Sequence, residues 1–103
     1  MFERLMGKDG EYDPLEGSGY RYVKAIPLKS YEDIDEIKAE VRAGNIVITN
    51  VSPLAKTDID KVKRGINELN EYAQILEGDI ARLGEERIIL TPKTIKIWRK
   101  PRE

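Results

Sequence analysis

Residues 78–92 read GDIARLGEERIILTP, and this stretch decides the fold. Gly78 follows a long helical pattern, at a point where a residue able to adopt positive φ is expected to end the helix. Residues 79–83 then have the pattern of a short strand, and Gly84 stands where a hairpin must reverse. Residues 87–91 form a second strand. The stretch therefore predicts a β-hairpin that directly follows a helix.

The second strand of this hairpin is apolar on both faces. Ile88 and Leu90 point to one side, and Ile89 points to the other. A strand of this kind needs apolar cover on both sides, and the domain's own helices provide only one. A second copy of the chain is the expected cover for Ile89, which predicts a homodimer.

Strand and helix patterns alternate through the rest of the chain. The order β-α-β-α-β-β-β predicts an α/β (α+β) two-layer sandwich, with two helices on one face of a mixed five-stranded sheet. Thr57 is the expected N-cap of the second helix. The predicted elements are strands at 20–26, 46–51, 79–83, 87–91 and 94–98, and helices between residues 30 and 44 and between 57 and 77.

The amino-acid composition excludes several classes of function. The chain has 103 residues, which suits one small domain, and it contains neither cysteine nor histidine. Thiolate metal sites, disulfides and the commonest general base are therefore excluded, and we expect no catalytic residue, no metal and no cofactor. The acidic residues cluster on predicted helix faces or at turns, as solvated residues do. Serine has no histidine to activate it.

The first nineteen residues differ from the rest. Residues 1–7 form a very short amphipathic pattern, in which Met1, Phe2, Leu5 and Met6 supply a candidate membrane-contact surface. Residues 8–19 have the glycine-rich, acidic composition of a flexible linker. The folded domain is expected at 20–99, followed by a tail at 100–103. No apolar run approaches the ~18 residues of a spanning helix, so an intracellular protein is expected.

The long predicted helix carries a glycine that its core role does not require. Gly65 and Tyr72 lie on one flank of the apolar stripe that includes Leu69. A glycine inside a helix costs ~1 kcal/mol relative to alanine, so a close packing contact should offset it. That contact is either with the protein's own layers or with a second copy. The sequence therefore leaves two alternatives for the dimer interface, this helix flank or the hairpin residues Gly78, Ile80 and Ile89.

The chain resembles the SepF family of cell-division proteins. The resemblance covers roughly residues 24–92 and depends on the apolar strand at 46–51, the helix from Thr57 and the glycine-rich segment at 78–92. In that family the globular domain dimerises and can assemble further. It binds the C-terminal peptide of the tubulin-like protein FtsZ, and an N-terminal amphipathic segment attaches it to the inner face of the membrane at the division site.

One position departs from the bacterial pattern. Bacterial members carry a glycine in the middle of the second helix that is important for self-association, and Glu71 stands at the matching position here. The chain therefore resembles the archaeal branch, and the resemblance implies a peripheral, cytoplasmic protein that tethers FtsZ to the membrane.

The FtsZ peptide needs a receiving site with an apolar floor and a nearby cation. Arg82 and Ile88 meet this requirement, because the hairpin brings their strands side by side. Leu83 and Leu90 are the expected apolar neighbours. The resemblance points to the same place, since family members carry a basic residue and an aromatic where this chain has Arg82 and Ile88.

The alternative function is a small RNA- or ligand-binding module. An exposed sheet face that combined aromatic and basic side chains would stack bases. The formal net charge of −1 argues against nucleic acid as a partner. The residues that would form this face are Tyr20, Tyr22, Lys24, Lys96, Trp98, Arg99 and Lys100.

Overall fold

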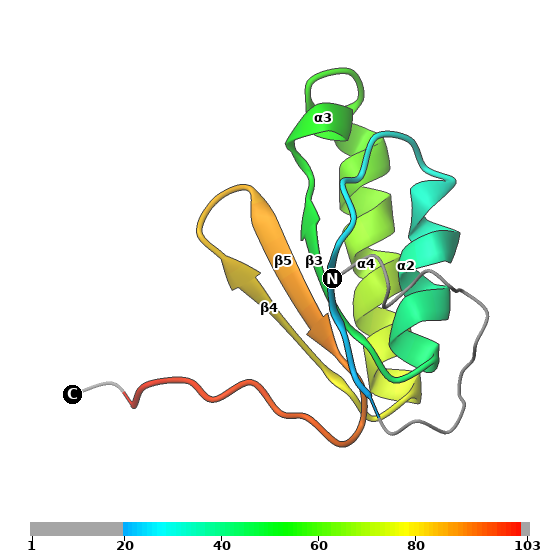
Figure 1. Ribbon diagram of the computed structural model, residues 1–103. Coiled ribbons are helices and arrows are strands. Elements are labelled where there is room, and N and C mark those ends of the chain that lie inside the picture. Colours follow the sequence, from blue (N-terminus) through cyan, green and yellow to red (C-terminus); the bar gives the residue numbers. More distant parts are fainter. Residues whose placement is uncertain (1–19, 102–103) are drawn as a thin grey trace, which may run out of the picture.

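The computed structural model describes residues 20–101, which form one sheet covered by helices on a single face (Figure 1). The elements are β2 (Val23–Ala25), α2 (Asp33–Arg42), β3 (Ile46–Asn50), α3 (Ser52–Ala55), α4 (Ile59–Ile75), β4 (Asp79–Leu83) and β5 (Arg87–Thr91). The mixed α+β architecture and the two long helices confirm the coarse fold predicted from the sequence.

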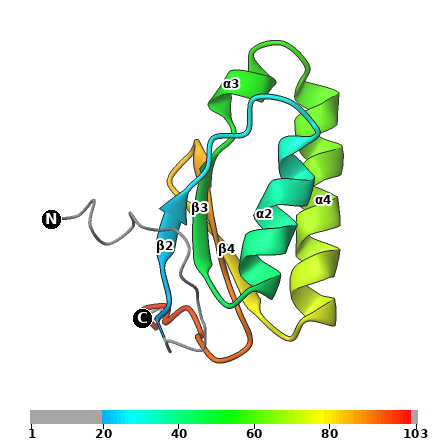
Figure 2. The ribbon, with the colours of Figure 1, turned by 45° about the vertical axis from the view of Figure 1, so that its right-hand side comes forward.

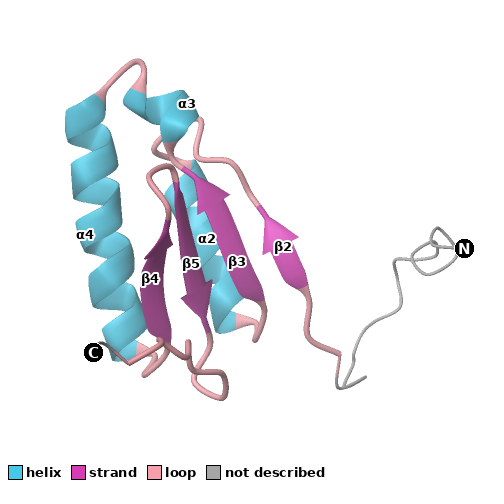
Figure 3. Ribbon diagram, turned by 90° about the vertical axis from the view of Figure 1, so that its left-hand side faces the viewer, coloured by secondary structure: helices cyan, strands magenta, loops and turns pink. Residues whose placement is uncertain are grey.

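The sheet has four strands in the described part of the chain, in the order β2-β3-β5-β4. Strands β2 and β3 run parallel, whereas β5 is antiparallel to both of its neighbours. Helices α2 and α4 both lie on one side of it (Figure 2), and the other side is open towards the viewer in Figure 3. We call these two sides the helix face and the open face.

The prediction of a fifth strand at 94–98 is wrong. After Pro92 the chain leaves the sheet and runs outward as an extended segment, residues 92–101, which we call the C-terminal arm (Figure 1). Hydrogen bonds at its base join it to β4 through side chains rather than through a backbone ladder: the Asp79 carboxylate accepts from the Ile97 N–H at 2.9 Å, and the Arg99 guanidinium donates to the Ile80 carbonyl at 3.0 Å.

Three local features also differ from the sequence prediction. The first strand is shorter, at Val23–Ala25, and the short helix α3 was not predicted. Pro53 is in its first turn, where a missing N–H costs no helical hydrogen bond. The N-cap of α4 is Asp58 rather than Thr57, because the Asp58 carboxylate accepts a hydrogen bond from the Lys61 N–H.

The end of α4 reverses the expected roles of two neighbouring residues. Glu77 adopts the positive φ, at 62°, and the N–H of Gly78 donates to the carbonyl of Ala73 at 2.8 Å, as in a Schellman motif. Gly78 is required for a different reason. A Cβ atom there would lie 2.1 Å from the carbonyl oxygen of Thr91.

The core lies between the two helices and the helix face of the sheet. Aliphatic side chains of α2, α4, β3 and β5 form one buried cluster. Burial of each large side chain stabilises the fold by about 1.5–3 kcal/mol. The fully buried apolar residues include Leu28, Ile34, Ile37, Val41, Val47, Leu69 and Leu90.

Candidate functional site

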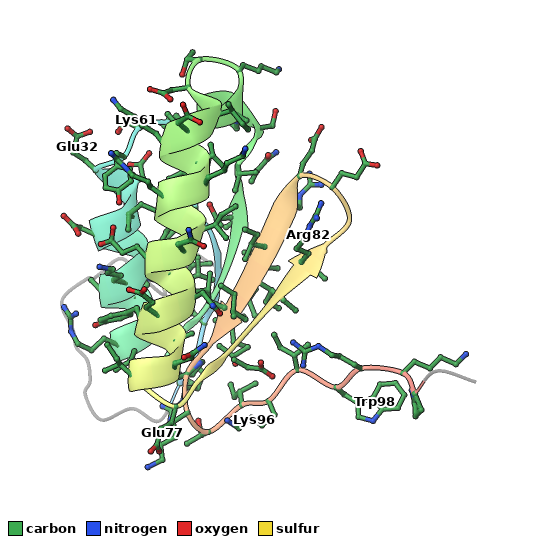
Figure 4. The ribbon with its side chains drawn as sticks, turned by 180° about the vertical axis from the view of Figure 1, so that it is seen from behind. Glu32, Lys61, Glu77, Arg82, Lys96 and Trp98 are labelled. Carbon is green, nitrogen blue, oxygen red and sulfur yellow. The ribbon has the colours of Figure 1, made fainter. Side chains whose placement is uncertain are left out.

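A groove opens between α4 and the β4–β5 hairpin, with a volume of ≈ 200 Å³. Ile66, Ile80 and Ile88 give it an apolar floor, and two asparagines of α4, Asn67 and Asn70, line it. Arg82 also lines the groove and places a cation beside this floor (Figure 4). An apolar hollow with a few polar groups at its edge suits an apolar peptide side chain that is flanked by charged or polar residues.

The hairpin register fixes the position of the cation. Arg82 is paired with Ile88 across the two strands, so both side chains lie on the helix face. The turn that sets this register contains Gly84, whose φ is 75°. Within the described part of the chain Arg82 has no ion-pair partner, and its charge is therefore available to a ligand.

The structure brings together two of the four residues predicted to bind the FtsZ peptide. Arg82 and Ile88 line one groove, as expected from the hairpin. Leu83 points to the open face, and Leu90 is fully buried in the core, so neither lines the groove. The residues of α4 that do line it were missed, because the rotation of a helix over a hairpin depends on tertiary packing.

The open face of the sheet is apolar, and no helix of residues 20–101 covers it. Its exposed and half-buried side chains come from all four strands, because alternate residues share a face. Val23 is 64% exposed and Leu83 is 43% exposed, although both are large apolar residues. The face consists mainly of Val23, Ala25, Ile46, Ile48, Ala81, Leu83 and Ile89.

The six residues predicted for dimerisation do not share one surface. Only Ile89 lies on the open face, opposite Ile48 of β3. Leu69 is fully buried in the core, Ile80 lines the groove, and Gly78 packs against the backbone at Thr91. Their part in dimerisation stays a prediction, and of the six only Ile89 belongs to the open face.

The helix flank that contains the other two residues is occupied by α2. A Cβ atom on Gly65 would lie 2.9 Å from Cδ1 of Ile34, so this glycine permits the two helices to approach. Tyr72 contacts α2 as well: the Arg42 guanidinium donates to its hydroxyl at 2.6 Å. The intramolecular alternative for Gly65 therefore has a physical basis in the α2–α4 contact.

A polar network closes the same flank on its solvent side. Glu68 of α4 accepts hydrogen bonds from the Lys38 ammonium and the Tyr31 hydroxyl. These bonds, with Lys38 the larger cause, hold the pKa of Glu68 below its ordinary value. The bond to Glu68 in turn raises the pKa of Tyr31. The network fastens α2 to α4 and leaves the groove on the opposite flank of α4 open.

Comparison with known proteins identifies the family. The family described as "Cell division protein SepF" matches residues 23–97, which is most of the folded domain. This chain belongs to the SepF family. The match spans β2, both long helices, the hairpin and the base of the C-terminal arm.

Solved structures and a curated relative agree with this family. A SepF-like protein from Archaeoglobus fulgidus is 34% identical with a TM-score of 0.71, over 80% of this chain and 99% of that one. A SepF-like protein from Pyrococcus furiosus is 29% identical with a TM-score of 0.70, over 84% and 100% of the two chains. The cell division protein SepF of Haloferax volcanii is 28% identical over 87% of this chain and 75% of its own length.

The sequence also predicts a set of membrane-contact residues and an RNA-binding sheet face. The membrane-contact residues Met1, Phe2, Leu5 and Met6 lie outside the described residues. The aromatic and basic residues of the RNA-binding alternative do not form one sheet face, since Lys24 lies on the helix face beside Glu40 and Trp98 lies on the arm. No helix in the described part of the chain has the length and apolar character needed to cross a bilayer.

Proposed function

We propose that this SepF-family chain is a non-enzymatic, dimeric adaptor that binds the C-terminal peptide of FtsZ. It holds FtsZ filaments at the cytoplasmic face of the cell membrane at the division site. The single observation that carries the proposal is the groove between α4 and the hairpin, with its apolar floor and with Arg82, which has no ion-pair partner among residues 20–101.

The groove supports peptide binding by two separable terms. Ile66, Ile80 and Ile88 offer apolar surface to an aliphatic or aromatic side chain, and Arg82 attracts an acidic residue beside it. Asn67 and Asn70 can form hydrogen bonds with the peptide backbone, because amide side chains both donate and accept. A peptide that alternates apolar and acidic residues would cover the apolar floor, pair with Arg82 and form backbone hydrogen bonds with the asparagines.

The open face supports the dimer. Ile89 and Ile48 are opposite each other on adjacent strands, and Ala81 continues the same apolar row onto β4. A second copy packed on this face would remove the row from water, and sheet-on-sheet packing is a common arrangement for such surfaces. The groove opens on the helix face, so dimerisation would leave it free.

Membrane attachment is assigned to residues 1–7, joined to the domain by residues 8–19. Their short apolar pattern gives weak attachment to lipid, and two copies in one dimer would raise retention through effective concentration.

The test is peptide binding measured by fluorescence anisotropy. A labelled peptide of the last ~15–20 residues of the same organism's FtsZ is titrated with the unmodified protein and with variants. Arg82→Glu should weaken binding by about 1–2 kcal/mol, or roughly 5–30-fold, and the loss should shrink as salt rises. Asn70→Trp, which places a bulky side chain at an exposed groove position, should weaken binding at every salt concentration.

Lys61→Glu is the matched control, because it changes the net charge by the same amount as Arg82→Glu. Lys61 lies at the start of α4, away from Arg82 (Figure 4). Equal peptide affinity for Arg82→Glu and Lys61→Glu would remove Arg82 from the site. Equal affinity for Asn70→Trp and the unmodified protein would remove the groove itself.

A further inference from the structure

Basic charge is concentrated at the C-terminus of the chain. The last twelve residues contain five Lys or Arg and one Glu, whereas residues 1–91 contain thirteen Lys or Arg and eighteen Asp or Glu. The only tryptophan, Trp98, lies within this basic segment, in the run Lys96-Ile97-Trp98-Arg99-Lys100. Such segregation places a cationic, aromatic segment on a domain whose remainder is acidic.

The arm is held at its base and exposed at its tip. Asp79 fixes it twice, by accepting the Ile97 N–H and by pairing with the Arg99 guanidinium at 3.5 Å. The ammonium of Lys96 donates to the Glu77 carbonyl at 2.9 Å. Trp98 stands between these anchored residues and is nonetheless 78% exposed. The fold therefore determines where the arm begins and leaves its largest apolar side chain in water.

The arm leaves from the end of the sheet at which the chain also enters the domain. The strands β2, β3 and β4 begin at this end and β5 finishes there, and we call it the basal end. In Figure 1 the arm runs outward from the basal end, away from the helices. The segment that precedes β2 brings two more aromatic residues to the same end. Tyr20 is 72% exposed and Tyr22 is 56% exposed.

The chemistry of this end matches a lipid surface. Tryptophan and tyrosine favour the boundary between lipid headgroups and acyl chains, and lysine and arginine are attracted to anionic headgroups. Two acids that contact the arm are paired with its own cations, Glu77 with Lys93 and Asp79 with Arg99. Proteins that bind single-stranded RNA stack successive bases on aromatic residues along one basic groove. The cations of the arm flank Trp98 alone, whereas Tyr20 and Tyr22 belong to the separate segment before β2.

We propose that the C-terminal arm is a second membrane-contact segment, in which Trp98 enters the headgroup region of an anionic bilayer and Lys96 and Lys100 bind its headgroups. The inference rests on the proposed membrane adaptor and adds to it the end of the domain that faces the lipid. Figure 4 shows Arg82 far from Lys96 and Trp98, so the peptide groove would remain accessible to a filament.

The test uses Trp98 as its own reporter, since the chain has no other tryptophan. The full chain is mixed with vesicles of phosphatidylcholine alone, or of phosphatidylcholine with phosphatidylglycerol. Phosphatidylglycerol should shift the Trp98 emission to shorter wavelength, and lipids brominated near the headgroup should quench it. Neutral vesicles should do neither to the same extent.

Two double variants separate local from overall charge. Lys96→Glu with Lys100→Glu should lower partition onto anionic vesicles by about 30-fold or more, because each basic residue near the surface contributes roughly fivefold. Lys56→Glu with Lys61→Glu changes the net charge equally at the other end of the molecule and should retain most of the binding. Both pairs should bind the FtsZ peptide as the unmodified protein does, which separates this inference from the groove.

Three results would overturn the inference. An unchanged Trp98 emission while the full chain pellets with anionic vesicles would assign the lipid contact to residues 1–7 alone. A blue shift that appears with rising protein concentration without lipid would assign the arm to a second copy. A shift produced by single-stranded RNA and not by vesicles would assign it to nucleic acid.

Discussion

Replacing Gly78 by alanine should separate the hairpin from the helix that precedes it. The added Cβ would lie 2.1 Å from the carbonyl oxygen of Thr91, whereas ordinary contact begins at 3.4 Å. The obstacle is backbone, so a side-chain rotation cannot relieve it. Thr91 is paired with Asp79 in the first rung of the β4–β5 ladder, so either this rung or the end of α4 must move. We expect the free energy of unfolding to fall by about 3 kcal/mol, which is at the upper end of the range for substitutions that overpack a site.

The loss of stability is measured by urea and thermal denaturation, followed by far-UV circular dichroism. The protein concentration is kept fixed, since the proposed dimerisation would make stability depend on concentration. A loss of this size should lower the Tm by roughly 10–20 °C in a domain of this length.

The neighbouring residue supplies a control of opposite sign. Glu77 adopts a φ of 62°, a conformation that costs a non-glycine residue about 1 kcal/mol. Glu77→Gly should therefore stabilise the protein by about 0.5–1 kcal/mol, since its exposed ion pair with Lys93 contributes little. If the free energy of unfolding of Gly78→Ala lies within about 0.5 kcal/mol of the parent value, the tight contact is refuted, whatever the result for the Glu77 variant.

Two further predictions concern assembly and pH. If the proposed dimer forms through the open face, Ile89→Lys should convert it to a monomer in sedimentation velocity, and Glu85→Lys at the exposed hairpin turn should not. A monomeric parent protein would contradict the open-face interface. The lowered pKa of Glu68 means that its bonds to Lys38 and Tyr31 stabilise the fold above the ordinary value of 4.5, and that this contribution is lost as the pH falls through the folded value. Denaturation midpoints should therefore fall less between pH 5 and pH 3 in Glu68→Gln than in the parent. An equal change of midpoint with pH in both proteins would exclude Glu68 as a contributor to the pH dependence of stability.

Local patterns predicted those parts of the fold that local interactions determine. The limits of β4 and β5 match the predicted strands, because apolar alternation and a glycine-containing turn fix a hairpin within a few residues. The same register placed Arg82 beside Ile88. The groove wall on α4 was not predictable in this way, since Asn67 and Asn70 reach it only through the rotation of the helix over the sheet.

The fifth strand shows where local propensity fails. Residues 94–98 alternate β-branched and polar side chains, as an edge strand does. The free edge of β4 is nevertheless occupied by side chains: Asp79 binds the Ile97 N–H and Arg99 binds the Ile80 carbonyl. These bonds satisfy groups that a backbone ladder would use, so residues 94–98 do not add a strand to the sheet. A sequence pattern does not reveal such competition.

The three surfaces assigned to the adaptor lie on different parts of one small domain. The proposed peptide groove lies between α4 and the hairpin, the proposed dimer face is the opposite side of the sheet, and the proposed lipid contacts lie at the basal end. Occupying one surface need not deform another, so no conformational coupling is required for the domain to connect a filament to a membrane. Retention at the membrane would then increase through valency alone, because each dimer brings two grooves and two arms, and each filament brings many peptides. On this reasoning, a variant defective at one surface should retain its intrinsic affinity at the other two and lose only the avidity that joint attachment provides.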